Sequence, residues 1–457
     1  MQHKDVLRHY LDRHAEPQAA RATALPGTFD RAIVVPAFNE GDAILDTFTT
    51  LLDSDRRVLL VLVANVPDTC SDYETAAMRT AALADTLATR FPATWDNAAD
   101  LSLHQVSASL SWLLVDCFSA GRRLPAKHGV GLARRIGCDI ACALFAAGKL
   151  REPWFVSTDA DVQPPPALAS VAASEHAGAH TLPFLHRWEG DERTRVAARL
   201  YDFYLRYHVW GLATAGSPYA HLSVGSTLML NASRYAQVRG FPKRSAGEDF
   251  HLLAKLAKLA PVMPLAGTPL VVRARVSARV PFGTGPAINT LRALHDPIAD
   301  YRLLHPGCFH ALRVVLDGVR TLYDERTDDL PGRVAASLPG VNGQRAALLL
   351  TNAGAREAVS RAREGASNRR RFLQHFHTWF DALKTQQFLH GLRDEGPGTL
   401  TLSNLLCHPL GPTLPPAPCE TEAQLETVVT AMTAACDEAL ARHWAGERVF
   451  GAPTEPG

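Results

Sequence analysis

Apolar residues along the chain gather in short, nearly continuous runs, separated by longer segments with helical spacing. The four runs cover residues 31–36, 57–64, 110–116 and 153–158. The helical segments between them cover residues 42–52, 72–91 and 129–147. Because the runs lack the alternation of a strand with one face in water, each predicts a strand covered on both faces. This order predicts an α/β chain with a doubly wound, mostly parallel sheet, whose ligand crevice lies beyond the carboxyl ends of the strands.

A different pattern begins near residue 290. From there the chain is rich in Ala, Leu and Arg at helical spacing, with a Pro-rich break at 411–418. We therefore expect an N-terminal extension at 1–29, an α/β domain at 30–289 and a mainly helical C-terminal region at 290–457. The sequence does not state the role of that last region. Since every motif described below lies before residue 290, the helical region is expected to be separable from ligand binding.

The composition excludes some classes of protein. Lys and Arg number 47 against 46 Asp and Glu, so the chain lacks the basic field that would favour a nucleic-acid partner. No apolar run reaches the roughly 18 residues of a membrane-spanning helix, and the first residues do not resemble a secretory signal. The 8 cysteines have no paired-motif spacing. Reduced thiols, no transmembrane segment and a cytoplasmic location are therefore expected.

The last apolar run ends in two carboxylates, Asp159 and Asp161. Two such oxygen ligands at the carboxyl edge of a buried strand can hold a divalent cation where a diphosphate would meet it. On its own, this pair is more often a turn or a helix cap. Two other segments accompany it: Pro-Ala-Phe-Asn-Glu at 36–40, after the first strand, and Glu-Asp at 248–249, where a helical segment begins.

In this order and spacing the three elements resemble those of the family 2 glycosyltransferases, which have the A-type nucleotide-diphospho-sugar transferase fold (GT-A). The resemblance covers roughly residues 30–285. It implies a metal-dependent enzyme that moves a sugar from a nucleotide-diphosphate donor to a hydroxyl group of a small-molecule or glycan acceptor. A hexose as the sugar and inversion at the anomeric carbon are the expected form of that reaction.

The resemblance gives the acidic residues their roles. Asp159 and Asp161 would hold Mn²⁺ or Mg²⁺ at the donor diphosphate, with Asp161 as the usual direct ligand and Asp159 also bordering the donor. Asp249 would be the general base that takes the proton of the acceptor hydroxyl, and Glu248 would orient the acceptor or the loop. The alternative is a pair of first-turn carboxylates favoured by the helix dipole.

The nucleotide is expected beside the first two strands. Pro36, Phe38 and Glu40 would face the crevice, and Asn39 could cap a helix there. In the family an acidic residue usually follows the second strand and contacts the base or the ribose. Here Asn65 occupies that place, which is a departure from the pattern and leaves the base unassigned.

A basic loop before the third helical segment looks like the family's Gly-x-x-x-Ala-Arg loop. Within it, Lys127 and Arg134 are expected to contact the ribose or the phosphates of the donor. Gly129 and Gly131 would let an anion approach the backbone at the start of the helix.

Other arginines are open to two interpretations. Arg122 and Arg123 fit a solvated loop as well as an anion site. Arg273, Arg275 and Arg279 would bind an anionic ligand if they line the crevice. They fit the exposed face of a strand equally well.

Three other functions stay open. A retaining, soluble synthase of the glucosyl- or mannosyl-glycerate kind would be separated by the anomeric configuration of its product. A sugar-nucleotide pyrophosphorylase shares the α/β core, but its Gly-rich, Arg-containing loop should follow the first strand, where residues 36–40 stand instead. A non-catalytic sugar-nucleotide-binding protein is disfavoured because both acidic motifs are intact. The oligomeric state is not indicated.

Overall fold

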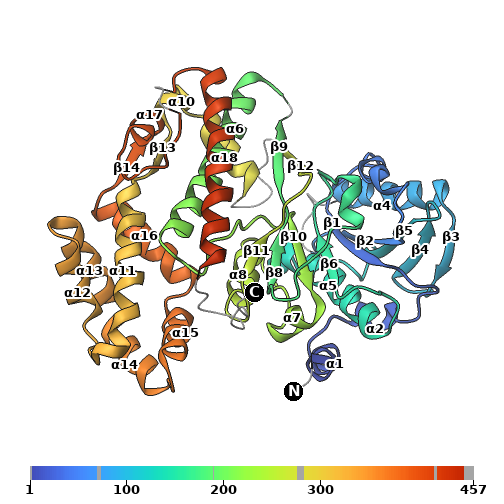
Figure 1. Cartoon of the computed structure of the whole chain (residues 1–457). Coiled ribbons are helices and arrows are strands. Elements are labelled where there is room, and N and C mark those ends of the chain that lie inside the picture. The colour runs from blue at the N-terminus through green and yellow to red at the C-terminus, as the bar shows by residue number, and fades with distance from the viewer. Residues whose placement is uncertain (1–2, 69–73, 189, 275–282, 416–418, 447–457) are drawn as a thin grey trace.

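A computed structural model describes residues 3–68, 74–188, 190–274, 283–415 and 419–446 (Figure 1). An α/β part holds the two larger sheets, and a region made mainly of helices lies beside it (Figure 1). The α/β class and the helical region after it are therefore confirmed. In the part of the chain that is described, no helix is both long enough and apolar enough to span a membrane.

A nine-stranded sheet is the centre of the α/β part, in the order β11-β8-β10-β6-β1-β2-β5-β4-β3. Its strands are β1 (Arg31–Ala37), β2 (Val58–Asn65), β3 (Ala93–Asp96), β4 (Leu101–Gln105), β5 (Leu110–Cys117), β6 (Trp154–Ser157), β8 (Ala179–Thr181), β10 (Leu228–Asn231) and β11 (Val262–Pro264). The central strands β6, β1, β2 and β5 are parallel to one another. They are the four apolar runs of the sequence, because only strands with helices or loops on both faces need no polar face.

The sheet as a whole is mixed rather than mostly parallel. Strand β10 pairs antiparallel with β6 and with β8, and β4 pairs antiparallel with β5 and with β3. Strand β3 is largely exposed and β4 is short. Neither has the continuous apolar run that reveals a central strand. The parallel prediction holds for the centre of the sheet and for the edge pair β11 and β8, but not for the strands between and beyond them.

Helices cover both faces of the parallel strands. Helix α5 (Gly129–Ala146) packs on one face, where a Cβ at Gly137 would come within 2.3 Å of Cγ1 of Val34. This close approach explains a glycine in the middle of a buried helix. Helix α4 (Glu74–Arg90) covers the other face through residues such as Leu83 and Leu87. The predicted helix at 42–52 is shorter and divides into α3 (Ile44–Thr47) and the 3₁₀ turn Thr49–Leu51.

The N-terminal helices α1 (His3–Arg13) and α2 (Pro17–Ala22) pack on α5. The hydroxyl of Tyr10 donates a hydrogen bond to Oδ1 of Asp139 over 2.6 Å, and both side chains are buried. The extension is thereby joined to the α/β core.

A second, three-stranded sheet has the order β7-β12-β9 and consists of β7 (Val162–Gln163), β12 (Leu270–Ala274) and β9 (Phe184–Trp188). Strand β7 begins directly after Asp161. It pairs antiparallel with β12, so this sheet extends the carboxyl edge of β6. Helix α6 (Glu192–Thr214) follows β9.

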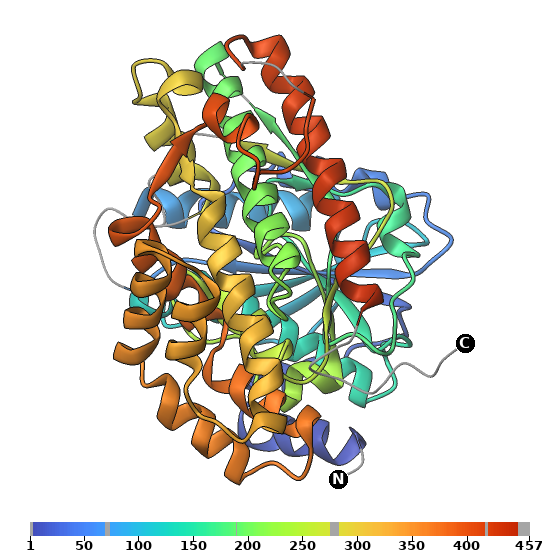
Figure 2. The ribbon, with the colours of Figure 1, turned by 60° about the vertical axis from the view of Figure 1, so that its left-hand side comes forward.

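The helical region begins with α9 and is built around α6. Its elements are α9 (Thr284–Arg292), α10 (Pro297–Asp300), β13 (Arg302–Leu304), α11 (Pro306–Glu325), α12 (Leu330–Ser337), α13 (Val341–Asn352), α14 (Ala355–Glu364), α15 (Arg369–Trp379), α16 (Ala382–Glu395), β14 (Thr399–Thr401), α17 (Leu402–Leu406) and α18 (Glu422–Ala445). The last helix, α18, runs alongside α6 in both views (Figures 1 and 2). Because buried residues of α6, α11 and α18 belong to one apolar cluster, the helical region shares a core with the α/β part.

Candidate active site

A buried guanidinium, that of Arg134 on α5, lies where the predicted motifs meet. Its Nε donates to Oε1 of Glu248 over 3.0 Å, and its Nη2 lies 2.7 Å from Oδ1 of Asp159. Its Nη1 donates to Oγ of Ser157 over 3.3 Å and to the carbonyl oxygen of Thr158 over 3.2 Å. The guanidinium of Arg134 therefore contacts both the aspartate after β6 and the glutamate that starts α8 (Glu248–Leu256).

Asp249 lies at the same place. A Cβ added at Gly225 would come within 2.9 Å of Nη2 of Arg134 and within 3.2 Å of Oδ2 of Asp249. The absence of a side chain at Gly225 thus lets the segment before β10 approach both groups. Three carboxylates, those of Asp159, Glu248 and Asp249, consequently surround one guanidinium.

In this cluster, burial and neighbouring charges shift the pKa of Arg134 in opposite directions. Burial lowers the pKa of Arg134, but the carboxylates of Asp159, Glu248 and Asp249 outweigh that and raise it above its ordinary value. Burial raises the pKa of Glu248 and also that of Asp249, and Arg134 offsets only part of each rise. Each acid of the adjacent pair therefore holds its proton more tightly than an exposed carboxyl group does.

The three acids differ in their exposure to solvent and in their hydrogen bonds. Glu248 keeps 6% of its side-chain exposure and is bonded to Arg134. Asp159 keeps 34%, so its carboxylate can still be reached by a ligand from solvent. Asp249 is half-buried, and its Oδ1 accepts a hydrogen bond from the backbone N–H of Phe250 over 2.7 Å. Chemistry at this site therefore has Asp159 and Asp249 on its accessible side.

Asp161 lies one residue beyond Ala160, at the start of the small sheet. Its carbonyl oxygen accepts a hydrogen bond from the backbone N–H of Arg273 over 3.3 Å, and its side chain is partly exposed. No group of three or more metal-ligating side chains occurs among the described residues. The protein could thus offer two carboxylates, and a diphosphate and water would complete the shell. That arrangement suits Mg²⁺, which keeps several waters and is bound through one or two carboxylates and substrate phosphates.

The residues after β1 and β2 lie at the same sheet edge. Asn65 donates from Nδ2 to the carbonyl oxygens of Ala37 and Val63, each over 3.0 Å. Its amide therefore fastens the carboxyl ends of the two strands together. Pro36 is buried within β1, and Phe38 is half-buried in the loop that follows.

Glu40 is also half-buried in that loop, after Asn39. Asn39 does not cap the next helix, because α3 begins after Ala43 and has no side-chain cap. Its backbone is instead left-handed, with a φ of 56°. Its Oδ1 is buried without a hydrogen-bond partner among the described residues, and so is Oγ1 of Thr158. These two unsatisfied polar atoms fit a polar ligand at this edge of the sheet.

The glycines at the start of α5 pack against a distant segment of the chain. A Cβ at Gly131 would lie 2.5 Å from the carbonyl oxygen of Pro242 and 2.6 Å from that of Arg244. A Cβ at Gly129 would lie 2.5 Å from Cα of Ser245. These glycines admit the chain's own segment 242–245, which gives them a packing role, and an anion beside them stays a prediction. The sequence could not reveal this packing, since the segment is more than 100 residues away.

The basic loop before α5 lies at the surface. Arg122 pairs with Asp116 over 2.6 Å, and Arg123 pairs with Glu74 over 3.2 Å. Both arginines thus belong to the surface, as the solvated-loop interpretation predicts. Lys127 is exposed in the 3₁₀ turn Ala126–His128, and its contact with the donor stays a prediction.

Arg273 is exposed on β12, between the buried Val272 and Ala274. This alternation fits the face of a strand. Arg275 and Arg279 lie outside the described residues.

A second buried cluster borders the site and was not anticipated from the sequence. Nδ1 of His186 lies 2.8 Å from Oδ1 of Asp202, to which Nη1 of Arg206 also donates, over 3.0 Å. The ring of Tyr201 lies 5.8 Å from that of His186, centroid to centroid. Burial raises the pKa of Tyr201, and the carboxylates of Asp249 and Asp202 raise it further. The pKa of Tyr201 therefore responds to carboxylates of both buried clusters.

No known family matches the chain, and no curated protein matches it. Among solved structures, it is similar to that of residues 1–349 of S. aureus TarS in complex with UDP-GlcNAc. The alignment covers 79% of this chain and 90% of that chain, at 12% sequence identity and a TM-score of 0.32. A similarity this weak assigns neither a family nor an activity to the chain.

Proposed function

We propose that the chain is a glycosyltransferase that moves a sugar, expected to be a hexose, from a nucleotide-diphosphate donor to a hydroxyl group of a small-molecule or glycan acceptor. One observation carries the proposal: Asp159, from the end of β6, and the Glu248-Asp249 pair, from the start of α8, meet around the guanidinium of Arg134. Sugar transfer needs a cation at the leaving diphosphate and a base at the acceptor oxygen. Carboxylates on the Asp159 side could hold the cation, and the Glu248-Asp249 pair could supply the base, within one cluster.

The donor diphosphate would lie on the side of Asp159 and Asp161. Together they would hold Mn²⁺ or Mg²⁺, which when bound would neutralise the charge that develops on the leaving diphosphate. The link from Asp159 to Arg134 fixes one carboxylate oxygen and leaves the side chain partly exposed. Asp161, in turn, is held by the pairing of β7 with β12.

The base would be Asp249. Its neighbour Glu248 is committed to Arg134, whereas Asp249 lies against Gly225 at the accessible side. Burial raises the pKa of Asp249, and a higher pKa makes a carboxylate a stronger acceptor for the proton of a hydroxyl group. A single displacement assisted by one base inverts the anomeric carbon, so inversion is the expected outcome.

Arg134 would act as a positioning residue. Each nitrogen of its guanidinium faces a protein group, so it orients Asp159 and Glu248 rather than binding the donor directly. Asn65 would likewise act through the backbone at the ends of β1 and β2. Phe38 and Glu40, in the loop after β1, and Lys127 would contact the nucleotide directly. Pro36 would shape the end of the strand before that loop.

The test is a panel of nucleotide sugars with Mn²⁺ or Mg²⁺, scored for release of the nucleoside diphosphate. At least one donor should be turned over, and the Asp249→Asn variant should lose that turnover. Asp46→Asn, an exposed acid that pairs with Arg90, is the matched control and should keep it. If no donor is turned over and no nucleoside diphosphate binds in the presence of metal, the proposal is wrong. A retained anomeric configuration in the product would instead assign a retaining enzyme.

A further inference from the structure

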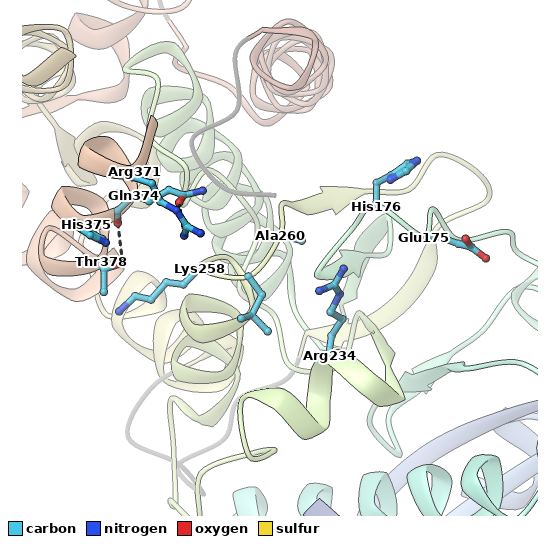
Figure 3. Close-up of a pocket in the computed structure, with 10 residues that line it drawn as sticks. Glu175, His176, Arg234, Lys258, Ala260, Arg371, Gln374, His375 and Thr378 are labelled. Carbon is cyan, nitrogen blue, oxygen red and sulfur yellow. Dashed lines mark hydrogen bonds between the residues drawn. The ribbon is translucent and has the colours of Figure 1, made fainter. Parts of the chain in front are cut away.

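A cavity of about 410 Å³ lies between the α/β part and the helical region. Its charged and ionisable lining residues are Glu175, His176, Arg234, Lys258, Arg371 and His375. They come from the segment before β8, from α7 (Ala232–Gln237), from the chain just after α8 and from α15. Figure 3 shows Arg234 and Arg371 approaching the cavity from different elements, with Ala260 between them.

The lining is strongly basic. Glu175 is the one acid among the described residues that line the cavity, and it is exposed, as is Arg371. Lys258 is paired with Asp381 over 3.0 Å. In the described part of the chain, neither Arg234 nor Arg371 forms an ion pair with a carboxylate. The cavity therefore collects two guanidiniums whose charge the protein does not neutralise.

The surroundings of Arg371 add to this imbalance. It lies in the first turn of α15, where Arg369 and Arg370 precede it. Cations are disfavoured at the start of a helix because the helix dipole is positive there. Among the residues that the structure describes, Nη1 of Arg371 donates to a neutral group, Oε1 of Gln374, over 3.2 Å. An anion in the cavity would offset both sources of positive potential.

The cavity is distinct from the candidate active site. Glu248 is the first residue of α8, whereas Lys258 lies just past the end of that helix. Ten residues at the helical rise of about 1.5 Å put roughly 15 Å between them. A ligand bound at Arg234 and Arg371 would therefore not occupy the place of the donor.

We propose that this cavity binds a small phosphate-bearing molecule, with its phosphate held by the guanidiniums of Arg234 and Arg371. Guanidinium groups match phosphate oxygens in geometry and in charge. The volume falls within the range of small-molecule sites, about 300–1,000 Å³, and exceeds what a free phosphate ion fills. An organic phosphate should therefore bind more tightly than inorganic phosphate.

The test measures binding of glucose 6-phosphate, inorganic phosphate and glucose to the full chain by calorimetry at constant ionic strength. Glucose 6-phosphate should bind, inorganic phosphate should bind more weakly, and glucose should not bind. Arg234→Gln and Arg371→Gln should each weaken binding about tenfold or more, as expected for loss of a charge-assisted hydrogen bond. Arg369→Gln makes the same charge change in the same helical turn, at an exposed residue outside the lining, and should weaken binding less than about threefold.

Equal binding of the two phosphates would support the anion site and identify free phosphate as its ligand. The absence of binding by any phosphate, or an equal loss in Arg369→Gln, would overturn the proposal. A nucleoside diphosphate with Mg²⁺ should not displace glucose 6-phosphate, and Asp249→Asn should bind it normally. Displacement would assign the phosphate to the candidate active site and also overturn the proposal. Because the assay measures binding, its result does not depend on the proposed glycosyltransferase activity.

Discussion

The Nε atom of Arg134 donates a hydrogen bond to Oε1 of Glu248 over 3.0 Å, and both side chains are buried. The bond joins α5 to the first residue of α8. It also gives the two adjacent acids different surroundings, which the sequence alone does not show. Glu248 is bound to the guanidinium, and Asp249 is left beside Gly225 on the accessible side.

This difference predicts distinct defects in two isosteric variants. Asp249→Asn should lower turnover about 10²- to 10⁴-fold, the usual contribution of a general base, with donor affinity nearly unchanged. Glu248→Gln keeps the shape but weakens a buried charged hydrogen bond, so it should mainly lower the free energy of unfolding, by about 1–3 kcal/mol. Turnover at saturating donor and urea unfolding measure the two effects. The reverse order of the turnover losses would refute the assignment of Asp249 as the base.

The raised pKa of Asp249 predicts a shifted pH profile. Turnover should rise with pH and level off above the ordinary range of a carboxyl group, because the base acts only when deprotonated.

The same raised pKa affects the free energy of unfolding with the opposite dependence on pH. Since the folded state holds this proton more tightly than the unfolded chain, the stabilisation is present at low pH and is lost as pH rises through the folded pKa. Rates and unfolding midpoints measured across pH check both, and Asp249→Asn should reduce the stability change to the part that Glu248, whose pKa is also raised, contributes. An acid limb at the ordinary aspartate pKa would contradict the burial argument.

Asp161→Asn tests the metal assignment. The change removes one of the two carboxylates expected to bind the cation, so Mn²⁺-dependent binding of a nucleoside diphosphate should fall sharply and turnover should be lost. Chelation of the metal in the unchanged chain should have the same effect. The comparison is with Asp46→Asn, which removes an exposed carboxylate from α3. Turnover that survives in Asp161→Asn and still requires metal would eliminate Asp161 as the ligand.

The parts of the fold that the sequence predicts are those determined by local pattern. The central strands are continuous apolar runs, which predicts strands that are buried on both faces. Helices α4 and α5 are predicted from the regular spacing of their apolar residues. Strands β3 and β4 lack such a run and were missed. The convergence of Asp159 with residues 248–249 was inferred through motif order. The bond from Arg134 to Glu248 spans 114 positions, and no local signal marks which of the two carboxylates the guanidinium selects.

Gly225→Ala tests how tightly the acidic cluster is packed. The new methyl group would lie 2.9 Å from Nη2 of Arg134 and 3.2 Å from Oδ2 of Asp249, which is closer than carbon normally approaches these atoms. One of the two groups must move, and turnover should drop by about tenfold or more because small misplacements of catalytic groups are costly. Gly446→Ala is the control, since its methyl group would meet the carbonyl oxygen of His443 at an ordinary 3.5 Å, far from the acidic cluster in the sequence. Equal turnover in both variants would show that Asp249 needs no fixed position.

The contact between α6 and α18 predicts that the helical region cannot be removed from the α/β part. Helix α18 buries Val428, Met432 and Leu440 within the same apolar cluster as Phe203 and Tyr207 of α6. Each such side chain contributes about 1.5–3 kcal/mol when buried. Loss of the whole face would therefore approach the roughly 5–15 kcal/mol that stabilises a typical domain.

A chain that ends at residue 415 should consequently aggregate, or unfold at much lower urea concentration than the full chain. The same is expected of a fragment that ends near residue 290, in contrast to the separable region that the sequence suggests. Glu426→Gln is the control, because it removes only the partly exposed ion pairs of α18 with Arg195 and Arg199. It should cost no more than about 1 kcal/mol per pair. A 1–290 fragment that unfolds cooperatively and binds a nucleoside diphosphate as the full chain does would show that the shared core is dispensable and that the donor site is complete without the helices.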